Sequence, residues 1–163
     1  MIRFGKSKEL FQEFYRTHYG RVRRTLSGMT GNFSVAEELT QEAFLKAWKG
    51  LPHFGFKSTL STWIFQVAIN VGRDWLRAHK TVSYSEGEAF EERGLTPEQR
   101  AVQESLLDLD EDARVVLILH YYEGMKIQEI GSVLKLPSGT IKSRLHSSKA
   151  KLKSLLLSKG FDV

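Results

Sequence analysis

The sequence predicts an all-α protein made of two small helical domains joined by a flexible linker. Apolar residues recur at intervals of three and four in every long segment, as they do on one face of a helix. Capping signals precede these segments and glycine or proline follows them, whereas no segment alternates in the manner of a strand. We expect the domains at residues 1–80 and 96–163, with an acidic linker at 81–95.

The first domain is expected to hold three helices. The first ends between Gly28 and Gly31, and a capping box of Ser34 and Glu37 opens the second, which stops before Pro52. The apolar stripe of the first helix is Leu10, Phe11, Phe14, Tyr15, Tyr19, Val22 and Leu26. The stripe of the third helix is Leu60, Ile64, Val67, Val71 and Trp75.

The second domain is expected to hold four helices. Thr96 and Gln99 form a capping box for the first of them, and Asp110 caps the second, which ends at Gly124. A short third helix precedes the break at 135–137, and Ser138 is the predicted cap of the last helix. Residues 81–95, between the two domains, lack periodicity and are rich in serine, glycine and glutamate, as a linker is.

The last two helices and their tight turn have the layout of a helix-turn-helix. Gly131 is expected where a side chain would intrude between them. The second helix presents a basic face to the major groove, and its first turn offers free backbone N–H groups to a phosphate. An ordinary amphipathic helix with a solvated basic face is the alternative. The shared apolar core is Ile127, Ile130, Leu134, Ile141 and Leu145. The residues expected to face DNA are Ser138, Gly139, Thr140, Lys142, Ser143, Arg144, His146, Ser147 and Lys149.

Aromatic and basic residues gather in the first domain, a mixture that suits single-stranded nucleic acid, where bases stack and phosphates pair. The aromatic residues are Phe54, Phe56, Trp63, Phe65 and Trp75. The basic residues are Lys57, Arg73, Arg77 and Lys80. The alternative is that Trp63 and Trp75, which fall at helical spacing, belong to the core. Phe54 and Phe56 flank Gly55 in a predicted loop and are better placed to be exposed.

The composition narrows the class of protein. The chain of 163 residues is 41% hydrophobic and 26% charged, as a folded globular protein is, and it has no cysteine for a disulfide or a thiolate metal site. Because no apolar run reaches about 18 residues and the N-terminus lacks a signal-peptide core, we expect a cytoplasmic protein without membrane insertion. Its net charge of +5 is unevenly spread, since two basic blocks flank acidic residues 81–110.

Three stretches resemble a known family in the same order. The stretch AEELTQEAFLKAWKGLPHF (36–54) resembles region 2.2 of the sigma-70 family of RNA polymerase sigma factors. The stretch STLSTWIFQVAINVGRDWLRAHK (58–80) resembles regions 2.3 and 2.4 of its extracytoplasmic-function (ECF) branch. Residues 123–152, EGMKIQEIGSVLKLPSGTIKSRLHSSKAKL, are similar to region 4.2 of that branch. The absence of a region 3 domain also fits, and the resemblance omits mainly the linker and the last residues.

The resemblance implies a promoter-specific initiation factor that binds core RNA polymerase at its β′ clamp and β subunits, with an anti-sigma factor as a further partner. Glu38, Gln41, Glu42 and Leu45 would contact the clamp, and the helix-turn-helix residues would read the −35 element. The −10 element and its opened strand would meet Phe54, Phe56, Lys57, Ser58, Thr59, Ser61, Trp63, Asn70, Arg73 and Arg77. Many relatives carry arginine where this chain has Lys142, and a bulky residue followed by arginine where it has His146-Ser147. Relatives also often have an acidic residue in the loop near Lys57, so the preferred promoter sequence is open.

Other classes of protein are disfavoured. The five histidines show no metal-ligand spacing, and no phosphate loop, HExxH or Ser-His-Asp pattern is present, so we expect no enzyme, metal or cofactor. A stand-alone helix-turn-helix regulator would not need the TQEAF and TWIFQVAIN stretches, and a basic recognition helix argues against an anti-sigma or adaptor protein. The acidic linker is open to three interpretations: it follows positive channels of the polymerase, it repels DNA in the free chain, or it is a solvated spacer.

Overall fold

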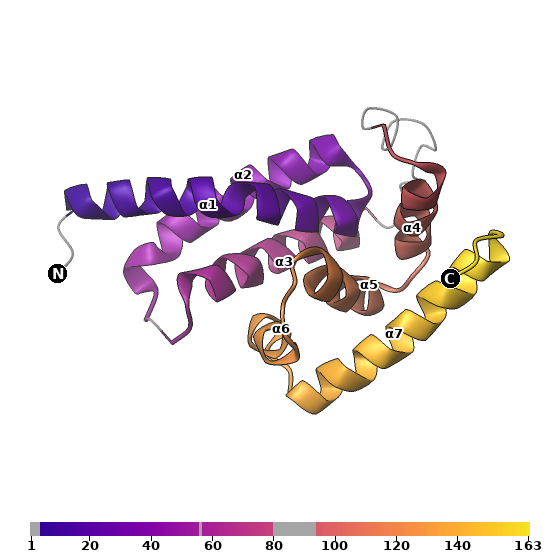
Figure 1. The fold of residues 1–163 in the computed structure, drawn as a ribbon. Coiled ribbons are helices and arrows are strands. Elements are labelled where there is room, and N and C mark those ends of the chain that lie inside the picture. Colours follow the sequence, from indigo (N-terminus) through magenta and orange to yellow (C-terminus); the bar gives the residue numbers. More distant parts are fainter. Residues whose placement is uncertain (1–3, 56, 80–93) are drawn as a thin grey trace.

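The computed structural model describes residues 4–55, 57–79 and 94–163, and every regular element in these ranges is helical (Figure 1). Phe56, Lys80 and most of the expected linker lie outside the described residues. Within the described ranges, no helix combines the length and apolar character needed to cross a membrane. The all-α prediction is confirmed.

Helices α1 (Phe4–Thr30), α2 (Phe33–Gly50) and α3 (Leu60–Ala78) form the N-terminal half, with the short 3₁₀-helix η1 (Leu51–His53) after α2. Alanines on the inner face of α2 let these helices approach closely. The buried residues of the bundle include Val22, Leu26, Met29, Ala36, Ala43, Phe44, Ala47, Ile64, Phe65 and Ala68. Leu10 and Tyr15, expected in the stripe of α1, are exposed, although the Tyr15 ring still packs against Phe44 with ring centroids 4.8 Å apart. The N-terminal turns of α1 extend beyond the other helices (Figure 1).

The C-terminal half comprises α4 (Pro97–Leu107), α5 (Glu111–Leu117), the π-helix η3 (Ile118–Tyr122) that continues α5, α6 (Ile127–Leu134) and α7 (Ser138–Ser158). Two predicted caps are confirmed: the Thr96 hydroxyl accepts a hydrogen bond from Gln99 N within a capping box, and the Asp110 carboxylate accepts one from Ala113 N. A carboxylate at this position also suits the positive end of the α5 dipole.

Two other predicted caps are wrong. Gly31 adopts a left-handed φ of 71° and turns the chain at once, so Asn32 is extended and its Oδ1 accepts from Val35 N at 3.0 Å. Asn32, not Ser34, therefore caps α2. Pro137, extended at φ −60° and ψ 147°, takes the cap position of α7 and makes Ser138 the first helical residue.

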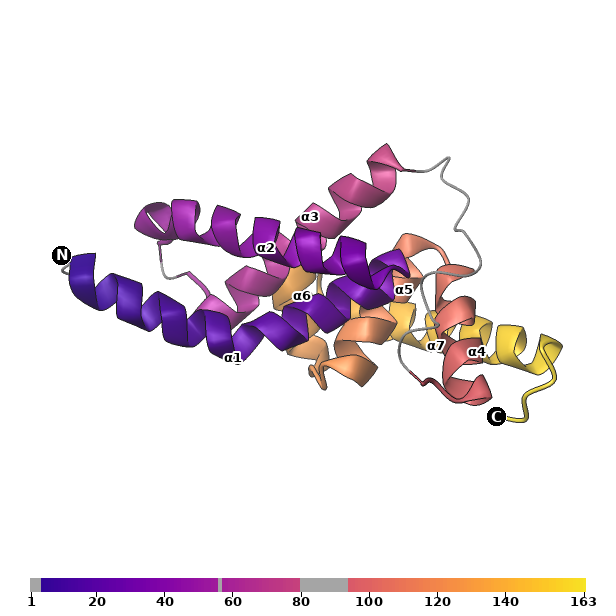
Figure 2. The ribbon, with the colours of Figure 1, turned by 90° about the horizontal axis from the view of Figure 1, so that it is seen from above.

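The C-terminal half packs directly against the N-terminal half, and both contribute to one apolar cluster (Figures 1 and 2). Val115, Val116, Ile118 and Leu119 join the buried residues of α1 and α3. The contact with α1 is close at Gly28, where a β-carbon would lie 2.9 Å from Ile118 Cδ1. Burial of apolar surface contributes about 25 cal/mol per Å², so this shared cluster holds the halves together.

A buried arginine reinforces the same contact. Arg114 is 6% exposed, and its guanidinium donates to the carbonyls of Leu106, Leu107 and Leu109 at 2.8–3.0 Å and to the carbonyl of Met29. Met29 lies in the last turn of α1, and Leu106 and Leu107 end α4, so the cation lies at the negative ends of two helix dipoles. It therefore supplies donors to carbonyls at the ends of both helices, where backbone partners run short, although Leu106 O also accepts from Leu109 N at 3.2 Å.

A second polar contact joins α1 to the end of η3. The Glu123 side chain is wholly buried and accepts hydrogen bonds from Arg21 Nε at 3.0 Å, Arg24 Nε at 3.1 Å and Thr25 Oγ1 at 3.3 Å. A carboxylate removed from water is costly unless its oxygens are paired, and both oxygens of Glu123 are. The contact thus fixes where η3 lies on α1.

Replacing Arg114 by methionine keeps much of the side-chain volume but removes the guanidinium donors from four carbonyls, of which, among the residues described, only that of Leu106 keeps a backbone donor, Leu109 N. Each buried carbonyl left unpaired costs about 1–3 kcal/mol, so we expect the free energy of unfolding to fall by roughly 3 kcal/mol or more. Urea denaturation followed by circular dichroism measures this. Arg100→Met, on the exposed side of α4, is the matched control, and an equal loss in both variants would contradict the assigned role.

Candidate nucleic-acid interface

Helices α6 and α7 form the predicted helix-turn-helix. Leu136 N donates to Gly131 O at 3.0 Å, and Lys135 adopts a left-handed φ of 55° that reverses the chain. A β-carbon at Gly131 would lie 2.8 Å from Leu136 O, and the nearest atom of α7, Ile141 Cγ1, would be 3.9 Å away. The glycine therefore makes room for the backbone of the turn more than for the second helix.

The outer face of α7 carries the residues expected to face DNA. Ile141 and Ser148 point into the fold and are buried, while eight of the nine expected residues are exposed: Ser138, Gly139, Thr140, Lys142, Ser143, His146, Ser147 and Lys149. The ninth, Arg144, is half-buried and lies 3.9 Å from Asp112. No acidic residue lies in the first turn of α7, so its free N–H groups present an unopposed positive end.

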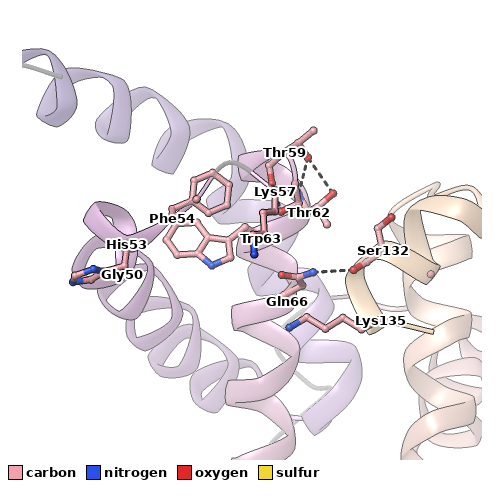
Figure 3. A pocket seen from close by; sticks show the side chains of 13 residues that line it. Gly50, His53, Phe54, Lys57, Thr59, Thr62, Trp63, Gln66, Ser132 and Lys135 are labelled. Carbon is pink, nitrogen blue, oxygen red and sulfur yellow. Dashed lines mark hydrogen bonds between the residues drawn. The ribbon is translucent and has the colours of Figure 1, made fainter. Parts of the chain in front are cut away.

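A cleft of about 1010 Å³ opens at the junction of α2, α3 and α6 (Figure 3). Phe54 stacks on Trp63 with ring centroids 4.6 Å apart and planes 24° apart. Of the residues expected at the −10 element, the cleft brings together Phe54, Lys57, Ser58, Thr59 and Trp63. Ser61 lies instead in a smaller neighbouring cleft of about 200 Å³ beside Glu123.

The aromatic residues Phe65, Trp75 and Trp63 lie in three different settings. Phe65 is fully buried in the core. Trp75 is half-buried and stacks on His79, with ring centroids 4.4 Å apart. Trp63 is half-buried and lines the cleft, and a β-carbon at Gly50 would lie 3.2 Å from its ring. Trp63 therefore packs on the core, as one interpretation of its spacing predicts, and also lines the cleft, while its role in binding a base stays a prediction.

The polar face of α3 adjoins this cleft. Asn70 and Arg77 are exposed. Arg73 is partly covered and pairs through Nε with Glu111 at 2.8 Å and through Nη2 with Asp112 at 3.2 Å. The side chains expected on this face thus share one side of α3, but one of them is engaged by the C-terminal half.

Several residues that line the cleft were not among those expected at the −10 element. Thr62 and Gln66 come from α3, while Ser132 and Lys135 come from α6, and Gln66 Nε2 donates to Ser132 O at 2.8 Å (Figure 3). Many residues separate α3 from α6 in the sequence, so no local sequence pattern links the residues that the two helices bring to the cleft. The polar face of α3, which includes Gln66, was the one available signal.

A separate surface lies on α2. Glu38, Gln41, Glu42 and Leu45 are all exposed along one side of this helix, and Leu45 is 53% exposed. Glu42 pairs with Lys46 at 2.9 Å. The result is a mixed acidic and apolar strip opposite the buried alanines. Among the residues that the structure describes, no group of histidine and acidic side chains is arranged to hold a metal ion.

The fold and these surfaces define the chain as an all-helical protein of the helix-turn-helix class. It has, in addition, a cleft lined by aromatic and basic side chains. Two family models match the chain: Sigma-70 region 2 over residues 14–82, and Sigma-70, region 4 over residues 95–152. Together with the relatives below, these matches confirm the resemblance seen in the sequence. The chain belongs to the sigma-70 family of RNA polymerase sigma factors, in its ECF branch.

Curated relatives match over most of the chain. The ECF RNA polymerase sigma factor SigW of Bacillus subtilis (strain 168) is 28% identical, over 91% of this chain and 90% of its own length. The RNA polymerase sigma-H factor of Pseudomonas aeruginosa is 30% identical, over 68% of this chain and 67% of its own length. The ECF RNA polymerase sigma-E factor of Escherichia coli (strain K12) is 30% identical, over 66% of each.

Solved structures share the fold. The co-crystal structure of the sigma factor RpoE in complex with the anti-sigma factor NepR from Bartonella quintana matches with a TM-score of 0.73 and 25% identity, over 90% of this chain and 96% of that one. CnrH in complex with the cytosolic domain of CnrY matches with a TM-score of 0.74 and 23% identity, over 93% and 90% of the two chains, which shows a likeness of fold.

Gly131→Ala tests the geometry of the helix-turn-helix. Its β-carbon would meet a backbone oxygen at 2.8 Å, and since backbone cannot yield as a side chain does, we expect a loss of about 1–3 kcal/mol in stability. Gly139→Ala in α7 is the control, because a β-carbon there would meet nothing within 4 Å and alanine favours helix. Thermal unfolding of both variants checks this, and an unaffected Gly131→Ala would contradict the close contact.

Proposed function

We propose that this sigma factor binds core RNA polymerase through α2, recognises the −35 element through α7, and captures a flipped base of the −10 element in the Phe54–Trp63 cleft. It acts by binding and carries out no chemistry of its own. The observation that carries the proposal is the stacked pair of Phe54 and Trp63 beside Lys57, in a chain that also exposes a basic recognition helix. Residues 1–80 and 96–163 would act as the two binding domains, joined by 81–95.

The cleft fits its proposed role on energetic grounds. Taking a base out of a duplex costs a few kcal/mol, and stacking on an aromatic side chain returns about 1–3 kcal/mol per base. Lys57 and the exposed Asn70 and Arg77 supply polar and cationic contacts for the freed strand. The base would enter at the rim where Thr59 and Thr62 bond to each other at 3.0 Å.

The recognition helix would set the register of binding. Lysines at 142 and 149 suit phosphate or guanine, and the serines at 143 and 147 suit either edge of a base pair. Because lysine is a point charge rather than a fork, contacts by Lys142 restrict the promoter sequence less than arginine would. Two modest sites on one chain act as a single avid site, since the second contact becomes intramolecular.

Regulation by an anti-sigma factor belongs to the same proposal. It is supported by the relative of similar fold that was solved with the anti-sigma factor NepR. Such a partner would cover the polymerase-binding or DNA-binding surfaces described above. The proposed function also implies that the protein acts in the bacterial cytoplasm, where polymerase and chromosome lie.

The direct test is run-off transcription with sigma-free bacterial core polymerase and the upstream DNA of the gene for this chain. We expect a specific transcript that is lost, with the fold intact, when Asn70 and Trp63 are changed to alanine, because the opened strand loses its contacts. Gln12→Ala, at an exposed position on α1 away from the cleft, should leave the transcript unchanged. Binding to duplex DNA without association with core polymerase would instead favour a stand-alone regulator.

The α2 surface is tested separately by Leu45→Gln. Removing an exposed apolar side chain that becomes buried in a complex costs about 1.5–3 kcal/mol, so affinity for core polymerase should fall about tenfold or more. Leu157→Gln is the matched control, since Leu157 is 48% exposed on α7, away from the α2 strip. Fluorescence anisotropy with labelled sigma factor measures both, and equal affinities would remove α2 from the proposal.

A further inference from the structure

The face of α3 that is proposed to meet the opened promoter strand is turned toward the C-terminal half of the same chain. Gln66 already donates to Ser132 O, and Ser132 and Lys135 line the base cleft from the α6 side (Figure 3). Arg73 pairs with two carboxylates, those of Glu111 and Asp112. One proposed DNA contact is therefore occupied by protein in the docked chain.

The same acidic pair reaches the second proposed DNA surface. Asp112 Oδ1 lies 3.2 Å from Arg73 Nη2 and 3.9 Å from Arg144 Nη1. Both arginines are about three-quarters covered, with side-chain exposures of 25% and 28%. The first turn of α5 thus places two carboxylates beside an arginine from α3 and an arginine from α7, where DNA phosphates would otherwise lie.

We propose that Glu111 and Asp112 compete within the chain for the arginines that bind promoter DNA, so that the docked sigma factor holds DNA more weakly than its arginines allow. The inference rests on the proposed function, because it takes Arg73 as a contact of the opened strand. Carboxylates here do what a phosphate does: they neutralise the guanidinium and accept its N–H groups. When DNA displaces the carboxylates of Glu111 and Asp112, Arg73 and Arg144 become available to bind the promoter.

The acidic pair can be removed without separating the two halves. Glu111 and Asp112 are 37% and 54% exposed, and ion pairs of this kind contribute little to the stability of a fold. The halves are held by the apolar cluster around Ile118 and by the buried contacts of Arg114 and Glu123. Neutral substitutions at the pair should therefore release the arginines while the fold and the docking persist.

The test compares Glu111→Gln/Asp112→Asn with the unmodified chain in binding a short fluorescent single strand rich in adenine and thymine. We expect affinity at low salt to rise about threefold to tenfold, by anisotropy. Glu104→Gln/Asp108→Asn is the matched control, because it makes the same change of charge in the same half but touches only Lys159 among the ion pairs described. Circular dichroism verifies the fold of each variant.

Arg73→Gln completes a double-mutant cycle. If the pair competes through Arg73, the gain from Glu111→Gln/Asp112→Asn shrinks markedly in the Arg73→Gln background. An equal gain in both backgrounds, or an equal gain from the control variant, shows a general effect of charge and overturns the inference. If Arg73→Gln lowers DNA affinity while the acidic pair changes nothing, the inference fails and the proposed function stands. No loss from Arg73→Gln in either background removes Arg73 from the proposed −10 surface.

Discussion

Arg114 occupies the point at which α1, α4 and α5 meet, and the arrangement of the two halves depends on it. A guanidinium can serve several carbonyls at once because its five N–H donors lie in one plane. Here those carbonyls close the C-terminal ends of α1 and α4. Once α5 is fixed in this way, Ile118 meets Gly28, Glu123 meets Arg21, and α6 comes to the rim of the Phe54–Trp63 cleft.

The cleft is consequently formed by both halves of the chain when they pack together. Its aromatic wall comes from the N-terminal half, whereas Gly131, Ser132 and Lys135 come from the helix-turn-helix. The residues that the family resemblance assigns to two distant promoter elements are neighbours in this arrangement, because Asp112 touches an arginine from each set. Under the proposed function, binding both elements of a promoter at once would require these two surfaces to move apart.

The helices were predictable because their signals are local. Apolar intervals of three and four, and the caps at Thr96 and Asp110, lie within a few residues of the structure they specify. The cap at Asn32 was missed because it follows from the left-handed φ of Gly31, which the Ser34–Glu37 pattern obscured. The exposed faces of α2 and α7 were likewise predictable, since the complement of an apolar stripe is a polar one.

The docking of the halves was beyond prediction from periodicity. Arg21 and Glu123 are 102 positions apart, and Arg114 and Met29 are 85 apart. The sequence of a single helix does not show whether a glutamate on it will be buried or solvated in the folded chain. The same holds for Gln66, whose partner is a backbone carbonyl on α6. Such contacts are determined by how whole surfaces fit, and the family resemblance supplied roles for residues without supplying this arrangement.

The π-helix η3 has a consequence for how the chain tolerates changes in length. Glu123 N bonds to Ile118 O across five residues, one more than an α-helix uses. Each residue of an α-helix advances the phase by about 100°, so the extra residue rotates everything that follows by that angle relative to a regular helix. It is this rotation that aims the Glu123 carboxylate at α1. The number of residues between Asp110 and Gly124 is therefore fixed by the fold. Deleting one residue there would turn the side chains that follow, including Glu123, to a different side of the helix.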